Sequence, residues 1–465
     1  MLEDTNQMFF PHGMHIMRQV TLILLAATFD CGFSIWGFSG EPDRIQENAA
    51  AAIRKHGGEV VCNEDVPGRP VVAVSLRGKE VSDADWENLA HLTTLTDLDL
   101  SYSQIPDAGL VNLKRFASLR RLNLACCLST EKSFESIPGM TSLERLDLSG
   151  NDLSEAGMKH LGGLKRLEDL QLAGTSVNGD GLRHLDSLPR LRVLNLRHTD
   201  IADADMKYIE RLSQVEELDL GCTQITGSSL PSLKKLSQLR VLGLDDLKIK
   251  NDDLRSLAGI CRLESLALNG ARVTDEGIRH LKILSRLKDV GLGGATINDQ
   301  GVADLSTMKQ LLCLGLAWTN ISDAGLEHLK SLKQLTSLSL DLTAITDAGL
   351  THVADMHDLV ILTLGDTKVS DAGLESIGRL RKLQVLYLYK TAISDDGLRH
   401  LGGLRELRTL LLWGTAISDA GLVHLEQLHQ LQELNVAGTK VTGGGVRGLQ
   451  SKLPKCLVRM EHEPR

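Results

Sequence analysis

Residues 311–332 read LLCLGLAWTNISDAGLEHLKSL, and the same arrangement of apolar positions returns every 24 residues along most of the chain. One column of equivalent positions runs in steps of 24 from Trp86 to Val446, and all sixteen of its residues are apolar. The columns through Val74, Leu76 and Leu89 are also apolar at all sixteen positions. A fixed period of this length predicts a solenoid, in which each repeat buries its apolar side only against its neighbours.

Within each repeat, the pattern predicts a strand, a turn and a short helix. Apolar residues alternate in the first part, which is typical of a strand, and Ser322 followed by Asp323 is typical of a helix start. Parallel strands lie about 4.8 Å apart, whereas helices are about 10 Å thick. Stacked repeats must therefore curve, and we expect an α/β leucine-rich solenoid with parallel strands on the concave face and short helices on the convex face.

Four segments follow from the extent of the pattern. Residues 1–40 differ in composition from the rest, and residues 41–70 predict a helix over 43–56, a strand over 59–62 and a turn over 67–70. A solenoid needs its ends covered, so we interpret residues 41–70 as an N-terminal cap. Residues 71–453 hold sixteen repeats, and residues 454–465 predict one last edge strand and a polar tail.

The N-terminal segment carries an apolar run over residues 20–28 that follows Arg18. A basic start and a short apolar core are typical of an export signal. Residues 18–38 together could instead anchor the chain in a membrane, although Asp30 would lie near the middle of that span. We therefore expect an exported protein of the cell envelope or periplasm, with the segment either cleaved or kept as an anchor. The alternative is a misassigned start, upstream of a cytoplasmic protein.

These motifs resemble the leucine-rich-repeat family, and specifically its ribonuclease-inhibitor-like branch. The Leu-x-x-Leu-x-Leu strand and the (Ser/Thr)-Asp-x-Gly-Leu-x-x-Leu helix carry the resemblance over residues 71–453. The helix motif is similar to F-box-associated arrays and to exported bacterial arrays, and the resemblance implies protein binding on the concave face. The 30 residues of 41–70 look too short for an F-box. The family's usual turn asparagine is mostly threonine here, and a threonine hydroxyl can still hydrogen-bond the turn backbone.

Composition narrows the function classes. The net charge of −9 argues against nucleic-acid binding, which needs a basic stripe. The eight cysteines show neither CxxC pairs nor metal-finger spacing, so neither a disulfide framework nor a cofactor is predicted. Seven aligned histidines, from His160 to His424, fall on the outer helices about 10 Å apart, too far to share a metal. An aligned column of aspartates, from Asp275 to Asp419, is interpreted as helix-start chemistry rather than calcium binding.

Aromatic residues gather at positions predicted to lie on the concave face. Tyr387 and Tyr389 are expected on one strand, and Leu411 and Trp413 at the same positions on the next strand. Exposed Trp and Tyr side chains with a charged rim are typical of a binding hot spot. The alternative is that these rings only cover a flat sheet. The predicted partner-binding residues are Trp318, Leu342, Asp366, Tyr387, Tyr389, Lys390, Leu411 and Trp413.

A second polar group is expected earlier in the array. His198, Cys222 and Asp246 are predicted to occupy the same concave position on three consecutive strands, about 5 Å apart, beside Arg197 and Asp245. In a catalytic triad the base stands between the nucleophile and the orienting carboxylate, whereas here Cys222 would stand in the middle. A flat row of this length also cannot close on one metal ion. We therefore expect a secondary contact area and no catalytic or metal site.

The sequence thus predicts a non-catalytic scaffold that recognises a protein partner on its concave face. Two alternative functions also fit the sequence. One is an adaptor subunit of a larger complex, such as a ligase-type substrate receptor, and the other is a structural component of the cell envelope.

Overall fold

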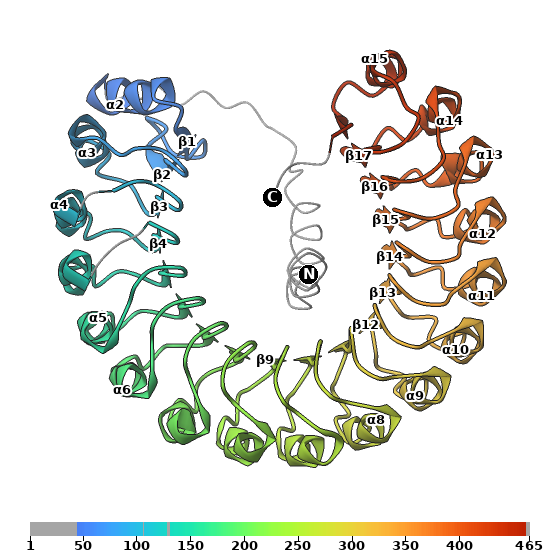
Figure 1. Ribbon diagram of the computed structural model, residues 1–465. Coiled ribbons are helices and arrows are strands. Elements are labelled where there is room, and N and C mark those ends of the chain that lie inside the picture. The colour runs from blue at the N-terminus through green and yellow to red at the C-terminus, as the bar shows by residue number, and fades with distance from the viewer. Residues whose placement is uncertain (1–43, 106, 128–130, 462–465) are drawn as a thin grey trace, which may run out of the picture. The chain divides into compact units, whose positions relative to one another are not determined.

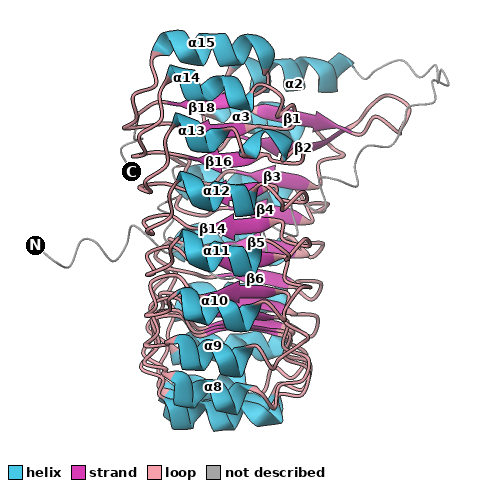
Figure 2. Ribbon diagram, turned by 90° about the vertical axis from the view of Figure 1, so that its right-hand side faces the viewer, coloured by secondary structure: helices cyan, strands magenta, loops and turns pink. Residues whose placement is uncertain are grey.

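Short parallel strands and outer helical segments repeat along the described chain (Figure 1). The computed structural model describes residues 44–105, 107–127 and 131–461. The chain divides into two compact units between Leu247 and Lys248, which we call the N-terminal unit and the C-terminal unit. Within each unit the strands lie on the concave side and the helical segments on the convex side (Figures 1 and 2). This confirms the predicted curved α/β solenoid.

The N-terminal unit begins with a helix and a strand at the places where the sequence predicts them. Strand β1 pairs antiparallel with β2, and every later strand of the unit joins the previous one in parallel. With 3-10 helices labelled η, its elements are α2 (Arg44–Lys55), β1 (Glu59–Cys62), β2 (Val71–Ser75), α3 (Asp83–Ala90), β3 (Asp97–Asp99), α4 (Asp107–Leu110), η1 (Val111–Arg115), β4 (Arg121–Asn123), η2 (Glu131–Gly139), β5 (Arg145–Asp147), α5 (Glu155–Lys159), η3 (His160–Gly163), β6 (Asp169–Gln171), α6 (Gly179–Leu182), η4 (Arg183–Ser187), β7 (Val193–Asn195), η5 (Asp203–Asp205), α7 (Met206–Ile209), β8 (Glu217–Asp219), η6 (Gly227–Lys235) and β9 (Val241–Gly243).

The C-terminal unit continues the same plan with more regular helices. Its strands pair in parallel from β10 to β18. Its elements are η7 (Asn251–Gly259), β10 (Ser265–Ala267), α8 (Asp275–Leu281), β11 (Asp289–Gly291), α9 (Asp299–Leu305), β12 (Cys313–Gly315), α10 (Asp323–Leu329), β13 (Ser337–Ser339), α11 (Asp347–Val353), β14 (Ile361–Thr363), α12 (Asp371–Ile377), β15 (Val385–Tyr387), α13 (Asp395–Leu398), η8 (Leu401–Gly403), β16 (Thr409–Leu411), α14 (Asp419–Leu422), η9 (Val423–Leu425), β17 (Glu433–Asn435), α15 (Gly443–Lys452) and β18 (Leu457–Arg459).

Strand register keeps equivalent residues side by side. In the parallel pairs, each residue lies opposite the residue 24 positions further on, as Leu314 lies opposite Leu338. From β2 to β17 the equivalent residue of each strand, such as Leu314, is leucine or valine and is buried. After the strand, a threonine hydroxyl donates to the carbonyl oxygen three residues earlier, for example from Thr319 to Leu316 at 2.6 Å. This confirms that threonine can satisfy the turn backbone in place of the usual asparagine.

The outer segments are short helices as predicted, but they differ in type from repeat to repeat. Segments η2, η6 and η7 are 3-10 helices over nine residues each, whereas α8 to α12 are α-helices of seven residues. Pro138 lies inside η2 and Pro231 inside η6. Because proline has no N–H to donate, it removes a hydrogen bond that an α-helix needs.

The aspartate column does more than begin its own helix. Asp347, at the first position of α11, accepts the backbone N–H of Ser370 at 2.7 Å and also its hydroxyl, and Ser370 is the N-cap of the next helix. The same bond to the next repeat is made by Asp203, Asp299, Asp323, Asp371, Asp395 and Asp419. The prediction placed this chemistry within one helix. The structure places it between repeats, because the carboxylate completes the next helix's cap.

A glycine makes room for this carboxylate. A Cβ added at Gly373, the third position of α12, would overlap Asp347, and the same holds at Gly349 for Asp323. Three repeats reverse the arrangement, since Asp85, Asp205 and Asp253 at the third position accept the N–H of their own N-cap residue at 2.8–3.0 Å. The repeats that precede those of Asp205 and Asp253 have glycine at the first helical position, namely Gly179 and Gly227. At the junctions with this bond, the carboxylate therefore comes from one repeat or from the other.

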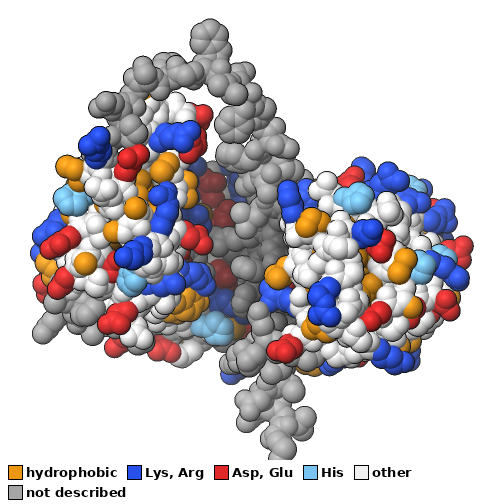
Figure 3. All heavy atoms as spheres, turned by 90° about the horizontal axis from the view of Figure 1, so that it is seen from above, with side chains coloured by type: hydrophobic (Ala, Val, Ile, Leu, Met, Phe, Trp, Pro, Cys, Tyr) orange, Lys and Arg blue, Asp and Glu red, His pale blue; other side chains and the backbone are white. Residues whose placement is uncertain are grey.

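The predicted export signal or membrane anchor, residues 1–40 with the span 18–38, lies outside the described residues. In the part of the chain that the structure describes, no helix is both long and apolar enough to span a membrane. On the surface seen in Figure 3, Lys and Arg side chains alternate with Asp and Glu side chains over the outer segments.

Candidate functional site

The predicted site residues lie partly on strands and partly in the turns that follow. Tyr387 and Leu411 are the last residues of β15 and β16. Trp318, Leu342, Asp366 and Lys390 lie in turns, and each has a positive φ between 52° and 58°. Each strand from β3 to β18 is only three residues long, which is shorter than the alternating pattern predicts. Tyr389 and Trp413 also lie in such turns, two residues after β15 and β16, so the prediction that they lie on the strands themselves is wrong.

In the C-terminal unit, two aromatic rings and an ion pair form one connected group. The rings of Tyr389 and Trp413 stack with their centroids 4.7 Å apart and an interplanar angle of 2°. The Nζ of Lys390 lies 5.1 Å from the centroid of the Trp413 ring and 3.9 Å from Asp366 Oδ2. Stacked rings and a cation over an aromatic face are both attractive contacts. They hold this part of the surface in one arrangement.

A buried carboxylate lies beneath Tyr389. Asp341 Oδ1 accepts the backbone N–H of Gly365 at 2.8 Å, and Oδ2 accepts the hydroxyls of Ser339 and Thr363. The hydroxyl of Tyr389 donates to the same carboxylate. Burial raises the pKa of Asp341 in spite of these four donors, and burial together with Asp341 raises the pKa of Tyr389. Asp341 therefore anchors the Tyr389 ring from below.

The exposure of the aromatic residues differs from the prediction. Tyr389 is only 9% exposed, so it is a buried support and not a contact residue. Tyr387, Leu411 and Trp413 are partly exposed, and Asp366 and Lys390 are exposed. Burial and the nearby carboxylates of Asp341 and Glu433 raise the pKa of Tyr387 to about 12. We call Tyr387, Tyr389, Leu411 and Trp413 the aromatic patch.

Trp318 is separate from the aromatic patch. Its side chain is 42% exposed, and it follows β12, whereas Trp413 follows β16. At about 4.8 Å per strand, four strand steps place the two turns about 19 Å apart. The structure therefore brings the stacked pair together with Lys390 and Asp366, and leaves Trp318 and Leu342 as a neighbouring surface along the same row of turns.

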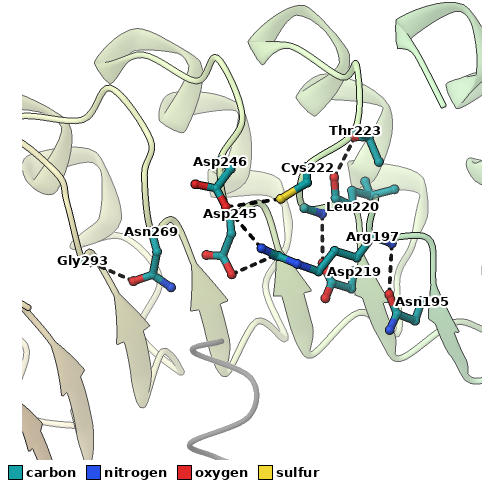
Figure 4. Close-up of polar contacts among 11 residues, drawn as sticks. Asn195, Arg197, Asp219, Leu220, Cys222, Thr223, Asp245, Asp246, Asn269 and Gly293 are labelled. Carbon is teal, nitrogen blue, oxygen red and sulfur yellow. Dashed lines mark hydrogen bonds and ion pairs between the residues drawn. The ribbon is translucent and has the colours of Figure 1, made fainter. Parts of the chain in front are cut away.

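In the N-terminal unit, Arg197 holds the second predicted group together (Figure 4). Its guanidinium donates to Asp245 and to Asp246, each at 3.2 Å. Arg197 and Asp245 are buried, whereas the Asp246 side chain is 44% exposed. Burial opposes the charge on Arg197, but the surrounding acidic groups raise its pKa above the usual value. The predicted secondary contact area is thus a buried ion pair with one exposed carboxylate.

The residues suited to chemistry do not form a reactive pair. The Cys222 Sγ donates to Asp246 Oδ2 at 3.2 Å, so the thiol is a hydrogen-bond donor. Burial and the neighbouring carboxylates raise the pKa of Cys222 to about 12, although Arg197 acts in the opposite direction. Burial and Arg197 lower the pKa of His198. His198, Cys222 and Asp246 lie in turns with positive φ, and not on strands as predicted. Among the described residues, no group of three or more His, Cys, Asp or Glu could hold a metal ion.

The raised pKa of Cys222 leads to a test of its reactivity. A thiol with a pKa of about 12 is only about 0.01% ionised at pH 8, and the thiolate is the nucleophile. At pH 8 we expect iodoacetamide to modify the exposed Cys261 at least about 100-fold faster than Cys222. Peptide mass spectrometry measures the two labelling rates. Asp246→Asn should speed the labelling of Cys222, because it removes one of the raising carboxylates. Labelling of Cys222 as fast as Cys261 would contradict the protonated thiol.

The two polar networks share one construction. A Cβ at Gly221 would overlap the Arg197 guanidinium, which passes over this glycine to Asp245 two strands away. A Cβ at Gly365 would overlap the Tyr389 ring, which passes over it to Asp341 two strands away in the opposite direction. Gly221 and Gly365 were not among the predicted site residues. The sequence does contain a pattern that could have indicated both networks. A long side chain, a glycine and an aspartate occupy equivalent positions in three consecutive repeats.

Three models of leucine-rich repeats match the chain. A leucine-rich repeat region matches residues 224–415, a leucine rich repeat model matches 141–201 and 189–249, and a third matches 91–114. A comparison with curated protein sequences gave no match.

Several solved structures are similar to this chain. An internalin, InlF, from Listeria monocytogenes is 25% identical over 66% of this chain and 88% of that chain, with a TM-score of 0.47. A leucine-rich-repeat protein of Leptospira interrogans is 21% identical over 91% of this chain and 100% of that chain, with a TM-score of 0.48. The plant peptide hormone receptor RGFR1, solved in complex with RGF2, is 15% identical over 86% and 71%, with a TM-score of 0.36.

The family models match where the leucine columns and the paired strands recur, so sequence and structure lead to the same conclusion. The chain belongs to the leucine-rich-repeat proteins.

Proposed function

We propose that this protein is a non-catalytic scaffold that binds a protein partner on the concave face of its C-terminal unit. The observation that carries the proposal is the aromatic patch, in which Trp413 is partly exposed but fixed on one side by the Tyr389 ring. Large aromatic side chains dominate binding energies at protein interfaces. Lys390 and Asp366 add an exposed polar rim to the patch.

Preorganisation supports this reading. The stack, the buried Asp341 and the short parallel strands hold Trp413 and Lys390 in place before any partner arrives. Binding then costs little of the ordering entropy that flexible side chains lose at an interface. Trp318 and Leu342 extend the proposed surface along the turns. Arg197, His198, Cys222, Asp245 and Asp246 are proposed as a secondary contact area in the N-terminal unit, with Asp246 as its exposed charge.

We also infer that the repeats belong to the ribonuclease-inhibitor-like branch of the family. Two features of the C-terminal unit support this inference. Its strands pair at offsets of 24 residues, and α8 to α12 are regular α-helices on the convex side.

Affinity capture from the native cell extract tests the proposed function. The bait is the full chain, compared with a Leu411→Ala/Trp413→Ala variant, and bound proteins are identified by mass spectrometry. We expect a partner that the parent retains and the variant loses, by at least about tenfold, as is typical of hot-spot truncation. The matched control is Tyr102→Ala, which removes an exposed aromatic residue of the N-terminal unit. Identical sets of proteins on all three baits would contradict the proposal.

A further inference from the structure

One turn position of every repeat adopts a backbone conformation that favours glycine. The residues at this position, 24 apart from Gly78 to Gly438, all have positive φ. Seven of these sixteen are glycine, and the other nine are Tyr102, Cys126, His198, Cys222, Asp246, Trp318, Leu342, Asp366 and Lys390. In the C-terminal unit the four residues other than glycine follow one another in consecutive repeats. They are flanked by Gly270 and Gly294 on one side and by Gly414 and Gly438 on the other.

The turn itself does not need a side chain at this position. The N–H of Trp318 donates to the carbonyl of Asp341 at 2.7 Å, and the N–H of Gly294 makes the equivalent bond to Ala317 at 2.9 Å. The left-handed region costs free energy for any residue with a Cβ and costs glycine almost nothing. Four consecutive repeats therefore carry strain that glycine would relieve. Strain of this kind is kept where the side chain serves a function.

We propose that the row formed by Trp318, Leu342, Asp366 and Lys390, which we call the turn row, determines which partner segment binds. This inference rests on the proposed function and names the occupant of that surface. The occupant is an extended segment of the partner that crosses the turns, with a large apolar side chain against Trp318 and Leu342 and a basic side chain near Asp366.

The spacing of the row favours an extended segment. Trp318 and Asp366 are two repeats apart, or about 10 Å at the spacing of parallel strands. An extended chain covers that distance in about three residues. Beside Trp318 the strand surface is bare, because Gly315 has only the backbone around Gly291 within 4 Å of an added Cβ. Glycine at such a place lets another backbone approach closely.

Charge favours a basic side chain near Asp366. Among the carboxylates at the strand and turn positions of the C-terminal unit, Asp289 and Asp341 are buried, and Glu433 lies 3.1 Å from Arg459 Nε. Lys390 Nζ lies 3.9 Å from Asp366 Oδ2, and the Asp366 side chain remains 43% exposed. A second cation can therefore reach the Asp366 carboxylate from the solvent side.

Glycine substitutions test the turn row without the risk of unfolding. The probe is a library of linear 12-residue peptides displayed on phage and selected on the full chain. We expect enriched peptides with an apolar and a basic residue about three positions apart. Their affinity should fall at least tenfold for the Trp318→Gly/Leu342→Gly variant, and again for Asp366→Gly. All three glycine substitutions should raise the urea midpoint of unfolding, because they relieve strain.

The controls separate this inference from the proposed function. Tyr102→Gly should also raise the urea midpoint, but leave peptide affinity unchanged. If Trp413→Ala abolishes binding of the selected peptides and the turn-row variants do not, the turn row is not a determinant and the proposed function stands. If neither set changes peptide affinity, both fail. A selection that enriches no peptide, or only peptides without a basic residue, overturns the proposed occupant.

Discussion

Moving one carboxylate from Asp347 to position 373 is expected to leave stability almost unchanged, although each half of the exchange is damaging alone. Asp347→Gly should lower the free energy of unfolding by about 2–3 kcal/mol, because the N–H and hydroxyl of Ser370 lose their acceptor. Gly373→Asp should cost about 1–3 kcal/mol, because the new side chain would overlap the Asp347 carboxylate. The double variant should lie within about 1 kcal/mol of the parent.

The chain already contains the exchanged arrangement. At Ala202 the N–H donates to Asp205 of its own repeat, and the first position of the preceding repeat is Gly179. A Cβ at Gly179 would overlap the Asp205 carboxylate, so the glycine is needed on that side of the junction. Asp253 and Gly227 repeat this arrangement two repeats further along the chain. The two forms therefore place one carboxylate at the same cap from opposite repeats.

A double-mutant cycle measures the exchange. Urea unfolding of the parent, the two single variants and the double variant gives the coupling energy between positions 347 and 373. We expect a favourable coupling of about 2–6 kcal/mol, which is the sum of the two single losses minus the loss in the double variant. Additive losses in the double variant would contradict a shared cap and would favour separate roles for Asp347 and Gly373.

Apolar columns made most of the fold predictable from the sequence. Leucines 24 residues apart can be buried together only if strands stack in register, and the paired Leu314 and Leu338 follow directly from that condition. The column of aspartates was also visible in the sequence, but the residues that these aspartates bond in the next repeat were not. The first-turn position explains an acidic residue by the helix dipole alone. Only the packed neighbour shows that the carboxylate of Asp347 bonds to Ser370.

The site was predictable in its composition and less so in its geometry. The large side chains of Tyr387, Tyr389, Leu411 and Trp413 were identified from the sequence, and the stack of Tyr389 on Trp413 brings two of them together. Alternation places both tyrosines on the same face, yet it cannot reveal that Tyr389 turns over Gly365 and becomes buried. The left-handed turns were also missed, because residues such as Trp318 and Lys390 rarely adopt positive φ.

The second large effect is expected from a single methyl group at Gly365. The Cβ of Gly365→Ala would overlap the ring of Tyr389, which must then leave its place above Asp341. Asp341 would lose a donor, and Tyr389 would lose its stack with Trp413. Overpacking and an unsatisfied buried carboxylate together should lower the free energy of unfolding by about 2–4 kcal/mol. Trp413 should become more mobile, and binding of a partner to the aromatic patch should weaken.

Two controls show whether the effect belongs to the ring. Gly315→Ala adds the same methyl group to a strand where the nearest atom, Gly291 Cα, is 3.4 Å away, so its cost should stay below about 0.5 kcal/mol. Tyr389→Phe keeps the stack and removes only the hydroxyl that donates to Asp341. It should therefore cost less than Gly365→Ala, about 1–2 kcal/mol. Urea unfolding gives the stabilities, and tryptophan fluorescence quenching reports the packing around Trp413. Unchanged quenching in Gly365→Ala would mean that the ring adapts without leaving Trp413, and that the glycine does not position the patch.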